Sequence, residues 1–162
     1  MSVEITTPRT TILYVEDDPN DILLFRHAFQ RAGSDCQLQI FSDSEEAIAY
    51  LKGADKFANR DRFPLPDLAL IDLKMPRVNG FELLAWIRAD PGLRWLPIVV
   101  LSSSNHLVDV KRAYESGANS YLVKPIDFTA LVELVRSVQQ YWLRLNHPPG
   151  EVPQPSRVIC CP

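Results

Sequence analysis

The chain has 162 residues, of which 46% are hydrophobic and 23% are charged, and its formal net charge is -3 at pH 7. This length suits one domain of about 100–200 residues, the apolar fraction excludes a wholly disordered chain, and the mildly acidic balance argues against a nucleic-acid binder. The sequence shows no secretory signal pattern, no apolar run near the about 20 residues that span a bilayer, and no disulfide framework among its three cysteines. These observations favour a cytoplasmic protein.

Five short apolar runs predict β-strands. They cover residues 11–15, 37–41, 68–73, 98–101 and 120–123. The first, third and fourth are almost continuously apolar instead of alternating with polar residues. That pattern is typical of strands buried on both faces of a parallel sheet.

Amphipathic stretches between and after the strands predict five helices. Asp18 and Pro19 supply an N-cap and a first helical residue for the first helix, which we expect to end at Gly33. The other four are marked by apolar residues at helical spacing within residues 43–53, 81–87, 108–117 and 127–142. Five strand–helix pairs predict an α/β domain whose parallel sheet carries helices on both faces.

Three further regions interrupt or follow this alternation. Residues 54–66 are polar, close with prolines and are expected to form a long loop. Residues 1–10 form an N-terminal extension to a domain at residues 11–145, and residues 146–162 form a flexible, proline-rich tail. The sequence assigns no role to the loop or to Cys160 and Cys161 in the tail. The aromatic and aliphatic end of the last helix, at residues 141–145, either packs on the domain or forms a homodimer surface.

Chemically reactive side chains follow the predicted strands. Ligands of open parallel sheets bind outside the carboxyl ends of the strands, where Glu16, Asp17 and Asp72 would crowd together if the first and third strands are neighbours. Such carboxylates need a neutralising cation, and a small set of oxygen ligands suits Mg²⁺. Ser102 adds a hydroxyl and Lys124 a positive charge, which together predict a cradle for a phosphoryl group. A carboxylate beside the cation can be the nucleophile that accepts the phosphoryl group.

Five short motifs in a fixed order point to one family. They are the acidic group in LYVEDD, then DLKMP, the Asn79–Gly80 helix start, VVLSSS and SYLVKP. Between about residues 11 and 145 the chain resembles a receiver domain of bacterial two-component response regulators. The resemblance implies a flavodoxin-like (βα)5 fold, a doubly wound parallel sheet of five strands in the order 2-1-3-4-5.

The resemblance also implies a role for each site residue. Asp72 takes the position of the phosphoacceptor, and Asp17 that of the direct Mg²⁺ ligand. Glu16 assists, often through water, and the backbone carbonyl of Lys74 takes the place of the third ligand.

The remaining family positions concern the response to phosphorylation. Lys124 pairs with the phosphoryl oxygens, Ser102 takes the hydroxyl position that moves toward the phosphate, and the Lys124–Pro125 peptide is expected to be cis. Tyr121 takes the aromatic switch position, with ordinary half-buried packing as the equal alternative. Phosphorylation would then shift the population of conformations and change the face formed by the fourth helix, fifth strand and fifth helix.

The implied function is a single-domain response regulator that receives its phosphoryl group from a sensor histidine kinase. FPLPDLALIDLKMP, PGLRWLPIVVLSSS and the final YWL resemble stand-alone receivers, some of which pair with bacterial phytochromes. Output would pass to a protein target and not to nucleic acid or a membrane. We expect no enzymatic activity beyond the protein's own phosphotransfer and slow autodephosphorylation.

Two other functions are weighed against this one. A metal-dependent phosphohydrolase also uses an aspartyl nucleophile, but that class generally has a second Asp two residues later, where this chain has Lys74. A flavin-binding module can have the same fold, but the acidic EDDPND loop would repel the phosphate of the cofactor.

Overall fold

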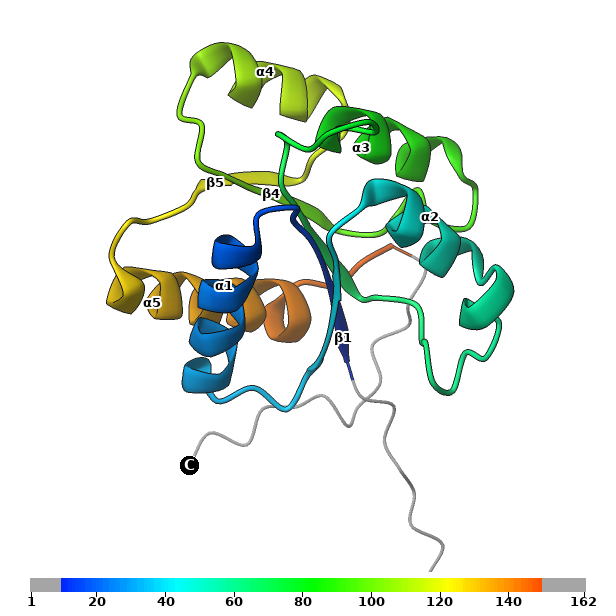
Figure 1. The fold of residues 1–162 in the computed structure, drawn as a ribbon, viewed down its shortest axis with the longest axis horizontal. Coiled ribbons are helices and arrows are strands. Elements are labelled where there is room, and N and C mark those ends of the chain that lie inside the picture. Colours follow the sequence, from blue (N-terminus) through cyan, green and yellow to red (C-terminus); the bar gives the residue numbers. More distant parts are fainter. Residues whose placement is uncertain (1–9, 150–162) are drawn as a thin grey trace, which may run out of the picture.

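The computed structural model describes residues 10–149, so the predictions for residues 1–9 and 150–162, Cys160 and Cys161 among them, lie outside the described residues. Five parallel strands form one sheet in the order β2-β1-β3-β4-β5 (Figure 1). The strands are β1 (Thr11–Val15), β2 (Gln37–Phe41), β3 (Leu68–Ile71), β4 (Ile98–Ser102) and β5 (Ser120–Val123). The predicted fold class and strand order are confirmed. β3 is two residues shorter than predicted because its register with β1 ends at the Val15–Ile71 pair.

Helices cover both faces of this sheet, as predicted. α1 (Pro19–Ala32) and α5 (Phe128–Gln139) lie together on one face, and α2 (Ser44–Lys52), α3 (Gly80–Ala89) and α4 (Leu107–Glu115) cover the other (Figure 1). The side chain of Asp18 accepts the N–H groups of Asn20 and Asp21 and so begins α1. Gly33 ends that helix with a φ of 71°, a left-handed conformation that glycine adopts without strain.

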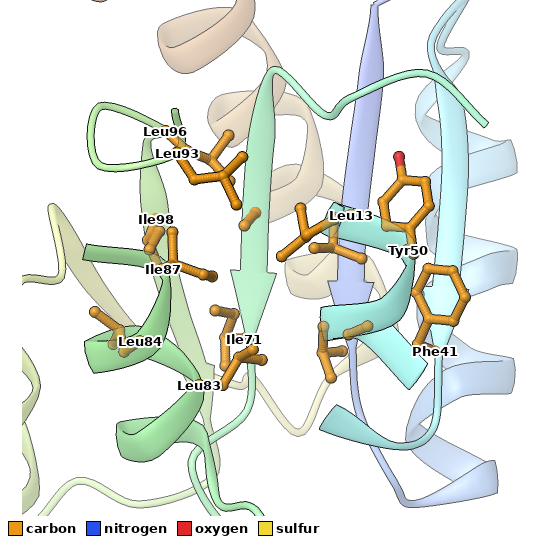
Figure 2. Close-up of a cluster of buried hydrophobic side chains, with 14 of the residues drawn as sticks. Leu13, Phe41, Tyr50, Ile71, Leu83, Leu84, Ile87, Leu93, Leu96 and Ile98 are labelled. Carbon is orange, nitrogen blue, oxygen red and sulfur yellow. The ribbon is translucent and has the colours of Figure 1, made fainter. Parts of the chain in front are cut away.

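Two apolar layers hold the helices to the sheet. Alternate residues of β1 face opposite sides, so Leu13 and Val15 pack under α2 and α3 while Ile12 and Tyr14 pack against α1 and α5. Figure 2 shows the first layer, in which the side chains from the helices interdigitate with those from the strands. Because β1, β3 and β4 are buried on both faces, their carboxyl ends are fixed rigidly relative to one another.

Residues 54–66 are more ordered than a polar loop would be. They begin with a short 3-10 helix, η1 (Asp55–Phe57), and the Phe57 ring is buried between neighbouring aromatic side chains. The Arg60 guanidinium donates hydrogen bonds to the carbonyls of Tyr50 and Leu51 at the end of α2. The prediction of an irregular loop overlooked these anchors, which tie the segment to the α2 side of the core.

α5 continues into a segment with π-helical hydrogen bonds, η2 (Gln140–Leu145). Trp142 and Leu143 pack against the α1–α5 layer, whereas Tyr141 and Leu145 are each about half exposed. Packing on the domain is therefore seen for Trp142 and Leu143, and a homodimer surface stays a prediction. Within residues 10–149, no helix combines the length and the apolar character needed to cross a membrane.

Candidate functional site

The register of the sheet places three carboxylates at one point. Val15 of β1 pairs with Ile71 of β3, and the Asp72 N–H donates to the Val15 carbonyl at 3.0 Å. The next residues along each strand therefore emerge side by side, and carboxylate oxygens of Glu16, Asp17 and Asp72 lie within 4.8 Å of one another. The predicted proximity of these three residues is confirmed. Hard oxygen donors gathered at this spacing fit a divalent cation such as Mg²⁺.

Glu16 is the most buried acid of the cluster, with 1% of its surface exposed. Its carboxylate accepts hydrogen bonds from the Lys124 ammonium, from the Tyr14 hydroxyl at 3.2 Å and from the Asp18 N–H at 3.1 Å. Burial raises the pKa of Glu16, and the hydrogen bond from Lys124 offsets this only in part. The Tyr14 contact was not predicted, because a tyrosine within a buried strand is expected to serve packing alone.

Asp72 is also buried, at 5% exposure. Burial raises the pKa of Asp72, and the nearby Asp17 adds to this, whereas Lys124 and the backbone N–H groups of Leu73 and Lys74 act in the opposite direction without cancelling it. A carboxylate taken out of water and set beside other carboxylates gains from a bound cation. The Lys74 side chain is exposed to solvent.

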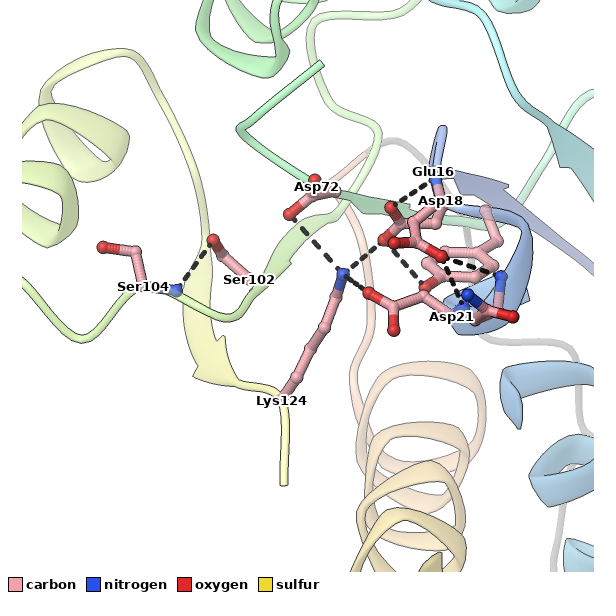
Figure 3. A network of polar contacts seen from close by, with 9 residues as sticks. Glu16, Asp18, Asp21, Asp72, Ser102, Ser104 and Lys124 are labelled. Carbon is pink, nitrogen blue, oxygen red and sulfur yellow. Dashed lines mark hydrogen bonds and ion pairs between the residues drawn. The ribbon is translucent and has the colours of Figure 1, made fainter. Parts of the chain in front are cut away.

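Lys124 stands where β5 leaves the sheet, and its backbone N–H donates to the Ser102 carbonyl at 2.9 Å. Its ammonium forms ion pairs with Glu16 and, at 2.7 Å, with Asp21, while the nearest Asp72 oxygen is 3.7 Å away (Figure 3). Burial on its own would lower the pKa of Lys124, but hydrogen bonds to Asp21 and Glu16 outweigh it and leave the pKa raised. Asp21 is thus a fourth carboxylate at the site that sequence analysis did not identify.

The peptide between Lys124 and Pro125 is trans, since no cis peptide bond occurs in residues 10–149. The expectation of a cis bond is therefore wrong for this structure. Trans is the lower-energy isomer of an X–Pro bond by about 0.5–1 kcal/mol, and the Lys124 ammonium reaches Glu16 from this conformation.

Ser102 and Tyr121 are linked through Ser104. The buried Ser102 hydroxyl oxygen accepts the Ser104 N–H at 3.2 Å (Figure 3), and the Tyr121 hydroxyl donates to the Ser104 carbonyl at 2.8 Å. The Ser104 hydroxyl in turn donates to the Asp109 carboxylate of α4 at 2.5 Å. The loop after β4 therefore ties Ser102 to both α4 and β5.

Gly80 fixes the backbone of Asp72. It is the first residue of α3, and a Cβ there would lie 2.1 Å from the Asp72 carbonyl oxygen and 2.7 Å from the Leu73 Cα. We expect Gly80→Ala to lower the free energy of unfolding by about 1–3 kcal/mol, because the backbone must shift to admit the methyl group. Urea unfolding measures this change.

The matched control for that variant is Gly92→Ala. A Cβ at Gly92 would meet only the Asp90 carboxylate oxygen, at 3.3 Å, and that side chain can move. We expect a change within about 0.5 kcal/mol. Equal stability of the Gly80 and Gly92 variants would contradict the close approach at Asp72.

A family model matches most of the chain. The model described as the response regulator receiver domain covers residues 12–136. The chain is 37% identical over 139 residues to the probable methanogenesis regulatory protein FilR2 of Methanothrix harundinacea. The aligned region covers 86% of this chain and 87% of that protein. It is 35% identical over 143 residues to the response regulator Rcp1 of Synechocystis, which covers 88% of this chain and 95% of that protein.

Solved structures show the same likeness over the same part of the chain. The response regulator RPA3017 in red light signaling of R. palustris superposes with a TM-score of 0.82 at 34% identity, covering 88% of this chain and 99% of that one. The phosphorylated cyanobacterial phytochrome response regulator RcpA gives 0.79 at 33% identity, with 88% and 99% covered. The Mn²⁺-bound form of Rcp1 gives 0.75 at 33% identity, with 87% and 99% covered.

Proposed function

Because the chain belongs to the response regulator receiver domain family of two-component systems, we propose that Asp72 accepts a phosphoryl group from the phosphohistidine of a sensor histidine kinase. The observation that carries this proposal is the placement of the Lys124 ammonium among Glu16, Asp72 and Asp21 at the carboxyl edge of the sheet. One fixed cation and a cluster of oxygen ligands frame a single carboxylate that can act as nucleophile.

The transfer needs an ionised and oriented Asp72. A carboxylate oxygen of Asp72 forms a bond to phosphorus as the phosphorus–nitrogen bond of the donor breaks, and the electron pair of that bond stays on the imidazole. The N–H groups of Leu73 and Lys74 hold the carboxylate and favour its charged form. The product is an acyl phosphate on Asp72, whose negative charge the Lys124 ammonium is close enough to offset.

Mg²⁺ is the cation that we assign to the cluster. Asp17, Asp72 and the backbone carbonyl of Lys74 would hold it directly, and it would offset charge on the phosphoryl oxygens. Glu16 would contact it through water, because three hydrogen-bond donors already occupy the Glu16 carboxylate. The Mn²⁺-bound form of the relative Rcp1 supports a divalent ion at such a site.

Ser102 and Tyr121 would transmit the change. The Ser102 hydroxyl hydrogen can donate to a phosphoryl oxygen while its oxygen still accepts the Ser104 N–H, and any movement of Ser104 alters the hydrogen bond that Tyr121 donates. Shifting the population from 1:99 to 99:1 requires about 5.5 kcal/mol, and hydrogen bonds to charged groups contribute about 1.5–3 kcal/mol each. A few such bonds are sufficient to switch the α4–β5–α5 face.

That face is a suitable output surface for a protein partner. Large apolar side chains are exposed along it, namely Leu107, Val108, Val123 and Ile126. Exposed apolar side chains on these elements are available for contact with a protein partner. The names of two similar solved structures, the phytochrome response regulator RcpA and the bacteriophytochrome response regulator RtBRR, support a bacterial phytochrome as the kinase. We also propose that the protein forms a homodimer and is located in the cytoplasm.

The activity is confined to the protein's own phosphorylation. Members of this family act in signalling, and we propose that this chain catalyses only its phosphotransfer and a slow autodephosphorylation. Neither the phosphohydrolase nor the flavin-binding alternative is supported by the family match or by the relatives.

Phosphorylation can be tested directly with acetyl phosphate and Mg²⁺. We expect the intact mass to increase by one phosphoryl group, the label to map by reductive trapping to the peptide that contains Asp72, and EDTA to prevent it. A label on another residue, or incorporation that EDTA leaves unchanged, would refute the assignment. Phosphotransfer from a panel of sensor kinases, bacterial phytochromes among them, then identifies the cognate donor.

A further inference from the structure

Asp21 brings a carboxylate to the site from outside the strand ends. It lies in the first turn of α1, and its Oδ2 is 2.7 Å from the Lys124 Nζ. Figure 3 shows the Asp21 side chain meeting this ammonium on a different side from Asp72. The Lys124 side chain is only 12% exposed, so few water molecules can replace the carboxylates as hydrogen-bond partners of its ammonium.

Asp21 and Glu16 together hold the Lys124 ammonium on the α1 side of the site. An ammonium has three N–H donors, and hydrogen bonds to Glu16 and Asp21 take two of them. The nearest Asp72 oxygen, at 3.7 Å, lies beyond hydrogen-bond distance. A phosphoryl group on Asp72 can take the third N–H, but any movement of the ammonium toward that group stretches its hydrogen bonds to Glu16 and Asp21.

Asp21 is the weaker of the two tethers. Glu16 is buried and keeps the Tyr14 hydroxyl and the Asp18 N–H as partners, whereas the Asp21 side chain is 34% exposed. Water can solvate the Asp21 carboxylate when the ammonium moves away. Loss of the ammonium is more costly for Glu16, because its buried carboxylate is not accessible to water. The start of α1 fixes Asp21 in place, because the Asp18 cap accepts the Asp21 N–H.

We propose that Asp21 is a positioning residue that holds Lys124 away from Asp72, so that it weakens binding of the phosphoryl group and strengthens binding of the divalent cation. This inference rests on the proposed function. Two effects act in the same direction on the phosphoryl group, since Asp21 competes for the ammonium and also repels the incoming anion. The same negative charge attracts a cation at the neighbouring Glu16–Asp17–Asp72 cluster.

Opposite effects on an anion and a cation make the proposal testable. For Asp21→Asn at saturating Mg²⁺, calorimetric titration with beryllofluoride is expected to show binding about tenfold tighter than for the unaltered protein, which corresponds to one hydrogen bond to a charged group. Titration with Mg²⁺ alone is expected to show binding about fivefold weaker. A loss of structure would weaken both, so the opposite signs separate positioning from damage to the fold.

Asp18→Asn is the matched control. This substitution removes one negative charge at a position three residues before Asp21 in the sequence. It keeps the N-cap of α1, because asparagine caps a helix as well as aspartate does. We expect its two affinities to stay within about twofold of the unaltered protein. Unchanged or weaker beryllofluoride binding in the Asp21 variant, or an equal gain in the Asp18 variant, would refute the proposal. Failure of the unaltered protein to bind beryllofluoride would instead count against the proposed function.

Discussion

Replacing Asp72 by asparagine is expected to abolish phosphoryl incorporation and to stabilise the metal-free protein at neutral pH. The amide has nearly the shape of the carboxyl group but is not a nucleophile, so no acyl phosphate can form. Asparagine also removes a buried negative charge that lies beside Asp17 and Glu16. The gain is expected to be about 3 °C in melting temperature, the shift that ~1 kcal/mol produces in a domain of this size.

The pH dependence of this gain follows from the raised pKa of Asp72. A group whose pKa is higher in the folded than in the unfolded state contributes stability that is fully present below its ordinary pKa and is lost as the pH rises through the folded pKa. The difference in melting temperature between the Asp72→Asn variant and the unaltered protein should therefore be small near pH ~4 and widen toward pH ~7. Thermal unfolding in EDTA at a series of pH values measures it.

Asp61→Asn serves as the control for the Asp72 variant. Asp61 is an exposed acid in the segment after α2 and does not belong to the carboxylate cluster. Its replacement is expected to change neither phosphoryl incorporation nor the melting temperature appreciably. Continued incorporation in the Asp72 variant, or a stability gain that shrinks toward neutral pH, would contradict our account of this carboxyl group.

The pattern of the sequence was sufficient for the strands, the helices and the residues that end strands, and the resemblance to receiver domains supplied the strand order. Continuous apolar runs identified β1, β3 and β4, and the Asp18–Pro19 pair located the start of α1. Residues that follow neighbouring parallel strands must emerge together, so the proximity of Glu16 to Asp72 follows from topology alone. No side-chain conformation was needed for that prediction.

The structure adds contacts that depend on how helices and side chains are placed. Asp21 comes from a helix, and its reach to Lys124 depends on how α1 packs against the sheet. Tyr14 lies within a strand, and only the length of its side chain brings the hydroxyl to Glu16. Asp21 lies in the first turn of α1, only a few residues after Glu16 and Asp17, and this closeness in sequence is a signal that could have suggested a further acid near the site.

The polarity of residues 54–66 misled for a similar reason. Five of the thirteen residues in this segment are charged, but Phe57 and Phe63 are spaced to reach the same aromatic cluster beside Phe41. One buried and one partly buried ring outweigh a polar average, because a large side chain that is fully removed from water contributes about 1.5–3 kcal/mol. Local composition therefore underestimated how firmly this segment is held.

Replacing Lys124 by methionine is expected to be costly both for stability and for phosphorylation. Methionine keeps the apolar stem of the side chain but removes the ammonium that Glu16, Asp21 and Asp72 share. Leaving a buried partner such as Glu16 without its counter-ion costs about 3–5 kcal/mol, which urea unfolding at neutral pH should show. Phosphoryl incorporation should slow by about 100-fold, the effect of losing one donor to the developing charge.

The loss of stability in the Lys124→Met variant should depend on pH and on Mg²⁺ in a specific way. Without the ammonium the pKa of Glu16 rises further, so that carboxyl group is more readily protonated and the penalty should shrink as the pH falls toward ~5. Mg²⁺ at neutral pH should restore part of the stability, because it supplies positive charge to the same cluster. Lys111→Met removes an exposed lysine paired with Glu115 and should cost less than about 1 kcal/mol. If the Lys124 and Lys111 variants were equally stable at neutral pH, the ammonium could not be what holds these carboxylates together.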